Sequence, residues 1–208
     1  MARRFTQRGG SMSIYSLKPA FQNLLRPIVQ RLYDKGVTAN QVTVLACLIS
    51  VFVGVLLCCF STHSALFLLL PLWLFLRMAL NAIDGMLARE FHQQSQLGGY
   101  LNELTDVISD SFLYLPFALI VPFHFWQIGL FIWLALLTEM CGILGQVHGN
   151  SRRYDGPLGK SDRAFLIGAL GLWYAIAGTF PPLFVWLMWG ACIMLIVTCY
   201  KRVRNGLI

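Results

Sequence analysis

Residues 65–88 read ALFLLLPLWLFLRMALNAIDGMLA, and this stretch decides the class of fold. It is wholly apolar as far as Leu76 and gathers polar residues only after that point. A helix that crosses the hydrocarbon core of a bilayer needs about 20 mostly apolar residues, and in lipid a run of this length satisfies its backbone only as a helix. The stretch therefore predicts a membrane-spanning helix that carries Asn81 and Asp84 near one end.

Five more apolar runs of similar length lie on either side of this one. Over its 208 residues the chain is 57% hydrophobic and only 12% charged, whereas a soluble domain carries about 25% charged residues. We therefore predict an all-α integral membrane protein with six transmembrane helices. The expected spans are residues 41–61, 65–88, 99–122, 125–147, 163–179 and 182–200.

Residues 1–40 precede the first expected span, and we expect no cleavable signal peptide there because they lack a suitable apolar segment. Apolar residues recur at helical spacing with basic residues between them, which predicts an amphipathic helix in the membrane interface. A surface helix packed on the protein itself would show the same pattern. We divide the chain into a cytoplasmic N-terminus, 1–40, and a transmembrane domain, 41–208. The apolar positions are Leu17, Phe21, Leu24, Leu25, Ile28 and Leu32.

Basic residues are expected on one side of the membrane only. They lie in residues 1–40, after the second span at Arg89, in the loop after the fourth span and in the C-terminal tail, while the other three connections contain no Lys or Arg. Because cytoplasmic loops are enriched in Lys and Arg, both termini should be cytoplasmic; in a bacterium the membrane would be the inner one. The net charge of +7 then reflects topology and attraction to anionic lipids, so we expect no nucleic-acid partner.

The polar residues of the second span continue into the third. Residues three or four apart share one face of a helix, so Asn81 and Asp84 form one stripe, and Asn102, Asp106 and Asp110 form another. The short connection makes the two helices antiparallel neighbours, and the stripes can then face each other near the cytoplasmic surface. Carboxylate and amide oxygens at this density suit a hard divalent cation such as Mg²⁺ or Mn²⁺.

Residues 81–106 resemble the signature of the CDP-alcohol phosphotransferases (CDP-alcohol phosphatidyltransferases), D-x-x-D-G-x-x-A-R-x8-G-x3-D-x3-D. Residues 38–43, TANQVT, and residues 159–160, GK, are also similar to segments of that family. Asn81 and Asn102 stand where the family has its first and third aspartates, so this chain is a variant that lacks two negative charges. The identities are Asp84, Gly85, Ala88, Arg89, Gly98 and Asp106.

The resemblance implies an enzyme that depends on a divalent metal. It would transfer a phosphatidyl group from a CDP-linked lipid, such as CDP-diacylglycerol, to an alcohol acceptor and release CMP, and it would work as a homodimer. Asp106 would be the general base on the acceptor hydroxyl, and Asp84 the second catalytic carboxylate. By the same resemblance, Asn81, Asp84, Asn102 and Asp106 would surround the metal and the pyrophosphate.

Other residues receive weaker assignments. Lys160 and Arg163 could hold a phosphate of the donor or the acceptor, or they could equally anchor the loop to lipid headgroups. Arg77 is expected to form an ion pair with Glu139 or an aspartate. Glu139 could instead line the acceptor pocket. The resemblance implies that the nucleotide pocket is shaped by Gly85, Ala88, Arg89 and Gly98.

Two other functions are left open by the residues themselves. The asparagines at positions 81 and 102 would also suit a non-catalytic relative that binds a CDP-lipid or an anionic lipid. Arg77, Glu139 and the aspartates could instead line a solute or proton pathway. The acceptor alcohol and the number of metal ions are not given by the sequence.

Overall fold

The structure, a computed structural model, describes residues 14–148 and 151–207, and within them the chain is entirely helical. Seven α-helices and two short 3₁₀ helices follow one another in these residues without a strand. The all-α fold class is thus confirmed. The elements are α1 Ile14–Asp34, α2 Ala39–Cys59, η1 Ser64–Leu68, α3 Leu69–Glu90, α4 Gln96–Tyr114, η2 Leu115–Leu119, α5 Phe125–Val147, α6 Lys160–Ala177 and α7 Phe184–Gly206.

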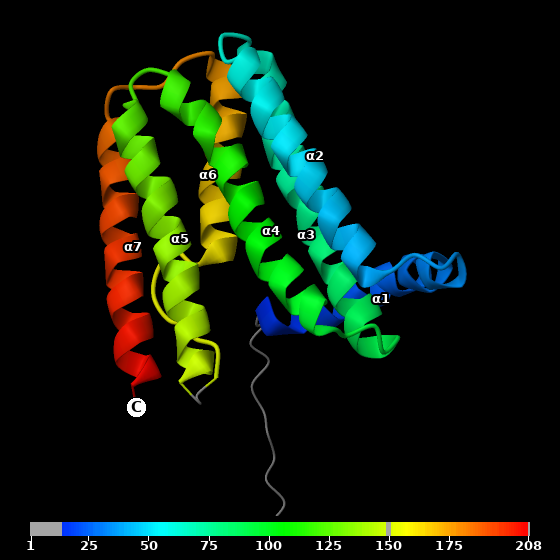
Figure 1. The fold of residues 1–208 in the computed structure, drawn as a ribbon. Coiled ribbons are helices and arrows are strands. Elements are labelled where there is room, and N and C mark those ends of the chain that lie inside the picture. The colour runs from blue at the N-terminus through cyan, green and yellow to red at the C-terminus, as the bar shows by residue number, and fades with distance from the viewer. Residues whose placement is uncertain (1–13, 149–150, 208) are drawn as a thin grey trace, which may run out of the picture.

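Helices α2 to α7 run side by side as one bundle, whereas α1 lies across one end of it (Figure 1). Helix α5 packs on α7, α2 on both α3 and α4, and α3 on α6. The C-terminus lies at the same end of the bundle as α1 and the α3–α4 connection (Figure 1).

Within the part of the chain that the structure describes, four helical segments are long and apolar enough to cross a membrane: Ala39–Cys59, Ser64–Glu90, Phe125–Val147 and Phe184–Gly206. Helices α4 and α6 are more charged. Helix α4 contains three acids, and α6 begins with two basic residues and one acid. The protein is therefore an integral membrane protein with four clear candidate spans, and the count of six stays a prediction.

Some helix boundaries agree with the predicted spans and others differ from them. The span predicted at 125–147 coincides with α5. Helix α4 begins earlier than predicted, because Ser95 caps it: its Oγ accepts the Gly98 N–H at 2.9 Å. The same span then changes to the 3₁₀ helix η2, which has Pro116 in its first turn. Proline lacks the N–H that would continue the α-helical hydrogen bonding, so the α-helix ends there.

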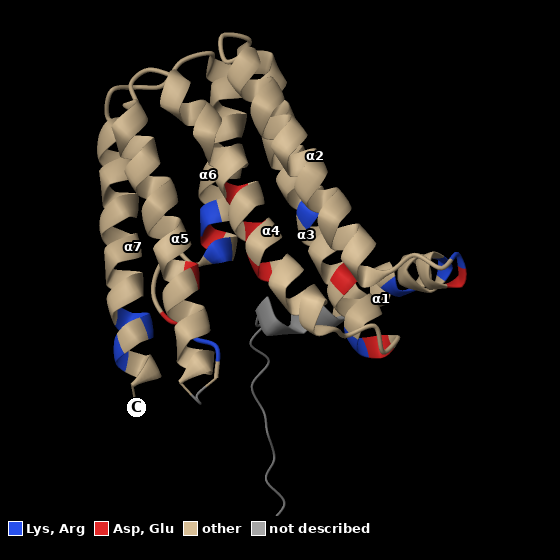
Figure 2. Ribbon diagram, in the orientation of Figure 1, with Lys and Arg blue, Asp and Glu red and all other residues tan. Residues whose placement is uncertain are grey.

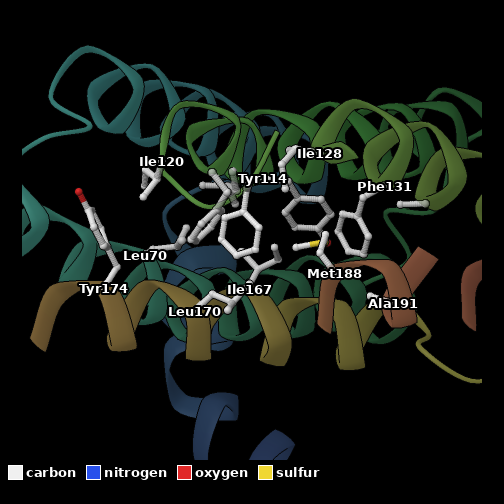
Figure 3. Close-up of a cluster of buried hydrophobic side chains, with 14 of the residues drawn as sticks. Leu70, Tyr114, Ile120, Ile128, Phe131, Ile167, Leu170, Tyr174, Met188 and Ala191 are labelled. Carbon is white, nitrogen blue, oxygen red and sulfur yellow. The ribbon is translucent and has the colours of Figure 1, made fainter. Parts of the chain in front are cut away.

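The main core lies in the half of the bundle away from α1 and joins α3, α4, α5, α6 and α7 (Figure 3). Tyr114, Phe131, Ile167 and Met188 are almost fully buried in it. Large apolar side chains also cover the outside of the bundle, and Phe165, for example, is 79% exposed. An exposed apolar surface of this extent is what a bilayer, rather than water, would solvate.

Helix α1 has two apolar faces. Leu25 and Val29 are buried in a second core with Met86 and Leu87 of α3, while Leu24 is exposed. Packing on the protein therefore explains one face and leaves the other unpartnered in the described residues. Residues 1–13, which hold part of the predicted basic cluster, lie outside the described residues, and so does the side chain of the predicted apolar position Leu17.

Helices α2 and α4 approach closely where they cross. A Cβ added to Gly54 would lie 2.3 Å from the carbonyl oxygen of Phe112. Only a residue without a side chain allows two backbones to come this near. The contact holds α2 beside α4, and it thereby brings residues 38–43 next to the polar stripes.

Candidate functional site

The charged residues of the bundle gather in the half that α1 lies against, and the other half carries almost none (Figure 2). Within that half, α3 and α4 run in opposite directions (Figure 1) and both pack on α2. The predicted direct packing of α3 on α4 is replaced by side-chain contacts, in which Arg77 of α3 pairs with Asp106 and Asp110 of α4. The sequence-predicted site residues on these helices thus fall in one region, although not all of them line the same space.

A cavity of about 600 Å³ opens between α2, α3 and α4. Of the predicted site residues, six line it: Asp84, Gly85, Ala88, Arg89, Gly98 and Asn102. Among the described residues around this cavity, Asn81, Asp106, Lys160 and Arg163 do not line it. The other lining residues are Ala39, Asn40, Thr43, Gln93, Gln94, Ser95, Gln96 and Gly99.

Asp84 is the carboxylate at this cavity, and it is 6% exposed. Thr43 on α2 donates its hydroxyl to Asp84 Oδ2 at 2.8 Å. A buried carboxylate needs such partners, because burial without hydrogen bonds is costly. Thr43 is not among the site residues predicted from the sequence, although it is the last residue of the TANQVT segment.

The two signature glycines of the cavity border on polar side chains. A Cβ on Gly85 would lie 2.9 Å from Arg89 Nη2, so the guanidinium of Arg89 covers this glycine. A Cβ on Gly98 would lie 2.9 Å from Asn40 Oδ1. Glycine at these positions leaves space that the side chains of Arg89 and Asn40 occupy. Like Thr43, Asn40 lines the cavity and is not among the site residues predicted from the sequence.

Asp106 lies beside this cavity, held between two cations. Its Oδ1 accepts from Arg77 Nη2 at 3.0 Å, and its Oδ2 accepts from Lys160 Nζ. Arg77 also binds Asp110, with 2.5 Å between Nη1 and Oδ1. The expected ion pair of Arg77 is thus made with two aspartates of α4, and Glu139 is not among the ion-pair partners of Arg77 in the described residues.

The ion pairs continue from Asp110 across the bundle to α5. Arg163, which is fully buried, lies 2.8 Å from Glu139 Oε1 and 3.6 Å from Asp110 Oδ2. Glu139 also accepts from Arg152 at 3.0 Å, and Arg152 forms a second ion pair with Glu103 of α4. The structure therefore places Lys160 and Arg163 among carboxylates inside the bundle.

The segment before α6 is hydrogen-bonded to α7. Arg202 on α7 donates to the carbonyl of Asp155 at 3.3 Å, and Asn205 donates to the Asp155 side chain at 3.1 Å. Hydrogen bonds from Arg153 and Asn205 hold the pKa of Asp155 below its ordinary value. These contacts fix the path of the chain into α6, where Lys160 is the first residue.

The oxygen atoms at the cavity fit one hard cation better than two. Asp84 has one carboxylate oxygen besides the one that binds Thr43, and Asn102 lines the same space. Both oxygens of Asp106 are taken by basic groups, and in the described ranges no three His, Cys, Asp or Glu side chains are placed to share a metal. Mg²⁺ commonly binds through one or two carboxylates together with substrate phosphates and waters, and Asp84 with Asn102 suits that mode.

The described residues form a helical membrane protein with a polar cavity between α2, α3 and α4, and comparison with known sequences identifies the family. The chain belongs to the CDP-alcohol phosphatidyltransferase family, whose sequence profile matches residues 36–197. The resemblance seen in the signature is thus confirmed for most of the chain. This family acts in phospholipid biosynthesis, and its members are membrane proteins.

The chain is similar to the inner membrane protein YnbA of Escherichia coli (strain K12). The two are 47% identical over 200 residues, which cover 95% of this chain and 98% of the relative. This similarity over nearly the whole length supports an integral inner membrane protein.

The fold is similar to that of phosphatidylinositol phosphate synthase (PgsA1) of Mycobacterium tuberculosis. The structure of that protein with CDP-DAG bound has a TM-score of 0.72 at 20% identity, covering 86% of this chain and 92% of that one. Its complex with manganese and citrate also has a TM-score of 0.72 at 20% identity, covering 87% and 88%. At this identity the likeness establishes a common fold.

Proposed function

We propose that the chain is a phosphatidyltransferase that moves a phosphatidyl group from a CDP-linked lipid, such as CDP-diacylglycerol, to an alcohol acceptor and releases CMP. The observation that carries this proposal is the cavity of about 600 Å³ lined by Asp84 and Asn102, with Asp106 one turn of α4 beyond Asn102 and paired with Lys160. Family membership and the CDP-DAG bound to the structural neighbour support the choice of donor.

In the proposed topology all six helices α2 to α7 cross the membrane. The charges of α4 and α6 are matched by partners within the bundle, which lowers the cost of placing them in the bilayer. Both termini and the cavity face the cytoplasm, since the basic residues lie at that end. Helix α1 then lies in the interface, with its exposed face toward lipid, ahead of the transmembrane domain of residues 41–208, and two copies of the chain form a homodimer.

The donor nucleotide is proposed to bind in the cavity against Gly85, Ala88, Arg89 and Gly98. Arg89 provides positive charge there for the pyrophosphate. Mg²⁺ or Mn²⁺ would be held by Asp84 and Asn102, with Asn81 one turn of α3 away. When bound, the cation would supply positive charge to the phosphate oxygens.

In the proposed reaction Asp106 accepts the proton of the acceptor hydroxyl. The hydroxyl oxygen attacks the phosphorus of the phosphatidyl group, a new phosphorus–oxygen bond forms, and the bond to CMP breaks. Lys160, whose side chain is 35% exposed, can leave Asp106 and bind a phosphate oxygen, which frees one carboxylate oxygen to act as the base. Arg77 is buried and keeps the carboxylate in place.

A second candidate function is supported by one observation. Asp106 is fully engaged by Arg77 and Lys160, and two family aspartates are Asn81 and Asn102. Such a site could bind a CDP-lipid or an anionic lipid without turning it over.

The two functions are separated by an assay of CMP release. Purified protein is incubated with CDP-diacylglycerol, Mg²⁺ or Mn²⁺ and a panel of alcohols. The proposal predicts CMP release that the Asp106→Asn substitution abolishes. If CMP appears only after Asn81→Asp and Asn102→Asp are introduced together, the native chain is a binding protein.

A further inference from the structure

One face of α1 carries apolar and basic side chains together, and none of them is covered by the bundle. Leu24 is 72% exposed and Ile28 is 47% exposed. Arg31 and Lys35 are exposed as well. The Lys35 N–H donates to the Arg31 carbonyl at 3.2 Å, which continues the helical turn past the end of α1. Because these four residues are three or four positions apart, they form one stripe along the helix, the outer stripe of α1.

The two basic residues of the outer stripe have no acid to pair with. The other charged side chains of α1 are engaged elsewhere: Arg26 Nη1 lies 2.8 Å from Glu90 Oε2, and the Asp34 carboxylate accepts a hydrogen bond from within α1. Among the described residues, neither Arg31 nor Lys35 forms an ion pair. The outer stripe therefore joins two uncompensated positive charges to an apolar surface.

An anionic phospholipid surface matches the outer stripe in both respects. Apolar side chains of an interfacial helix insert among the acyl chains, and neighbouring Lys or Arg side chains reach the headgroups. Helix α1 lies across the end of the bundle and extends beyond α2 and α3 (Figure 1), so in the proposed topology it runs along the membrane surface. A zwitterionic lipid would satisfy the apolar residues alone, whereas the two free cations favour a headgroup with net negative charge.

The opposite face of α1 packs on the wall of the large cavity. Leu25 and Val29 are buried there, in the second core. Two alanines, Ala39 of α2 and Ala88 of α3, belong to that core and also line the cavity of about 600 Å³. The position of α1 therefore bears directly on the shape of the cavity.

Polar and aromatic contacts join α1 to the last turn of α3. Arg26 pairs with Glu90, the residue that follows Arg89 of the cavity. The rings of Tyr33 and Phe91 lie 4.4 Å apart, centroid to centroid. Helix α1 thus supports, from outside, the turn that presents Arg89 to the cavity.

We propose that the outer stripe of α1 binds anionic phospholipids of the membrane, and that this docking favours the form of the cavity that binds a nucleotide. Lipid on one face of α1 and nucleotide in the cavity then favour the same position of α1 against α3. Two ligands that favour one state of a protein strengthen each other's binding. The first part concerns α1 alone, and the second rests on the proposed function, because it takes the cavity as the nucleotide site.

Hydrogen exchange of the α1 amides tests the docking without reference to catalysis. The whole chain is placed in nanodiscs of phosphatidylcholine, with or without phosphatidylglycerol, and exchange is followed by mass spectrometry. Each basic residue near an anionic bilayer surface favours the docked state by a factor of about five, so phosphatidylglycerol should slow exchange by roughly tenfold or more. Equal exchange in the two kinds of nanodisc would overturn the proposal.

A pair of double variants separates the outer stripe from general surface charge. Arg31→Gln with Lys35→Gln should abolish the effect of phosphatidylglycerol. Lys201→Gln with Arg204→Gln is the matched control, because it removes two exposed basic residues from the same end of the bundle, and it should keep the effect. Loss of the effect in both variants, or in neither, would overturn the assignment to the stripe. Equal slowing by millimolar inorganic phosphate in phosphatidylcholine nanodiscs would also overturn it, since the ligand would then be a soluble anion.

Binding of CDP tests the coupling to the cavity. Its Kd is measured with Mg²⁺ in the same two kinds of nanodisc. An anionic bilayer by itself repels a nucleoside diphosphate, whereas the coupling predicts a Kd about fivefold lower with phosphatidylglycerol, and no such decrease in the Arg31→Gln, Lys35→Gln variant. An unchanged or higher Kd would overturn the coupling. If CDP binds in neither nanodisc, the proposed function fails, and the exchange measurement still decides the docking.

Discussion

Replacing Gly54 with alanine should destabilise the bundle and disturb the cavity together. The added Cβ would lie 2.3 Å from the carbonyl oxygen and 2.7 Å from the carbonyl carbon of Phe112. Both atoms belong to the backbone of α4, so no side-chain rotation can relieve the overlap. Helices α2 and α4 would have to move apart.

The size of the effect follows from two opposing terms. Overpacking a tight contact costs about 1–3 kcal/mol, while alanine is better than glycine inside a helix by about 1 kcal/mol. The net destabilisation by Gly54→Ala should be up to about 2 kcal/mol. At Gly129 on α5 an added Cβ meets no atom within 4 Å, so Gly129→Ala keeps only the favourable term and should stabilise the protein slightly.

The assay is reversible unfolding in detergent, followed by tryptophan fluorescence, for the wild type and both variants. CMP release is measured in parallel, because α2 also carries Thr43. The hydroxyl of Thr43 donates a hydrogen bond to Asp84 Oδ2 at 2.8 Å, and a shift of α2 would disturb that bond. Gly54→Ala should be both less stable and less active than Gly129→Ala. If the two variants unfold at the same denaturant concentration, the close crossing of α2 and α4 is not present in solution.

Three further results are expected. Thr43→Val removes the hydroxyl that binds Asp84 and should slow CMP release by roughly 10–100-fold, since hydrogen bonds to charged groups contribute about 1.5–3 kcal/mol; Thr43→Ser should retain most of the activity, and equal rates for the two would contradict the role of the hydroxyl. Arg163→Met removes a fully buried cation that Glu139 and Asp110 share and should lower the free energy of unfolding by about 3–5 kcal/mol, against about 0–1 kcal/mol for Arg26→Met in an exposed pair; similar losses in chemical unfolding would refute this. Chelation by EDTA should stop CMP release and Mn²⁺ should restore it, with Asn81→Asp lowering the Mn²⁺ concentration required; release that persists in EDTA would exclude the metal.

Local sequence patterns predicted the helices well, and they grouped several residues that line one cavity, although Asn81 and Asp106 do not line it. Apolar runs located α5 at its observed ends, and the three- and four-residue spacing placed Asp84 and Asn102 on one cavity. These features depend on periodicity within one helix or between two consecutive helices, which a single sequence contains. The end of α4 at Tyr114 was missed because Pro116 was counted as part of an apolar run.

The contacts of the site were harder to predict because they join distant segments. Lys160 and Asp106 are 54 residues apart, and Thr43 and Asp84 are 41 apart. Nothing in the local pattern around Lys160 distinguishes a lysine that enters the bundle from one that contacts headgroups. Such pairings are set by how the helices pack.

The ion pairs between α3, α4 and α6 also bear on how the protein enters the membrane during synthesis. Each unpaired charge at the centre of an isolated helix costs about 2.5–3.5 kcal/mol on insertion. Helix α3 is made first and brings Arg77, which can neutralise Asp106 and Asp110 as α4 follows. Arg163 arrives only with α6. Helix α4 should therefore insert into the bilayer together with α3, as a helical hairpin. In a chain that is cut before α6, Arg163 is missing and α4 should be less stably inserted.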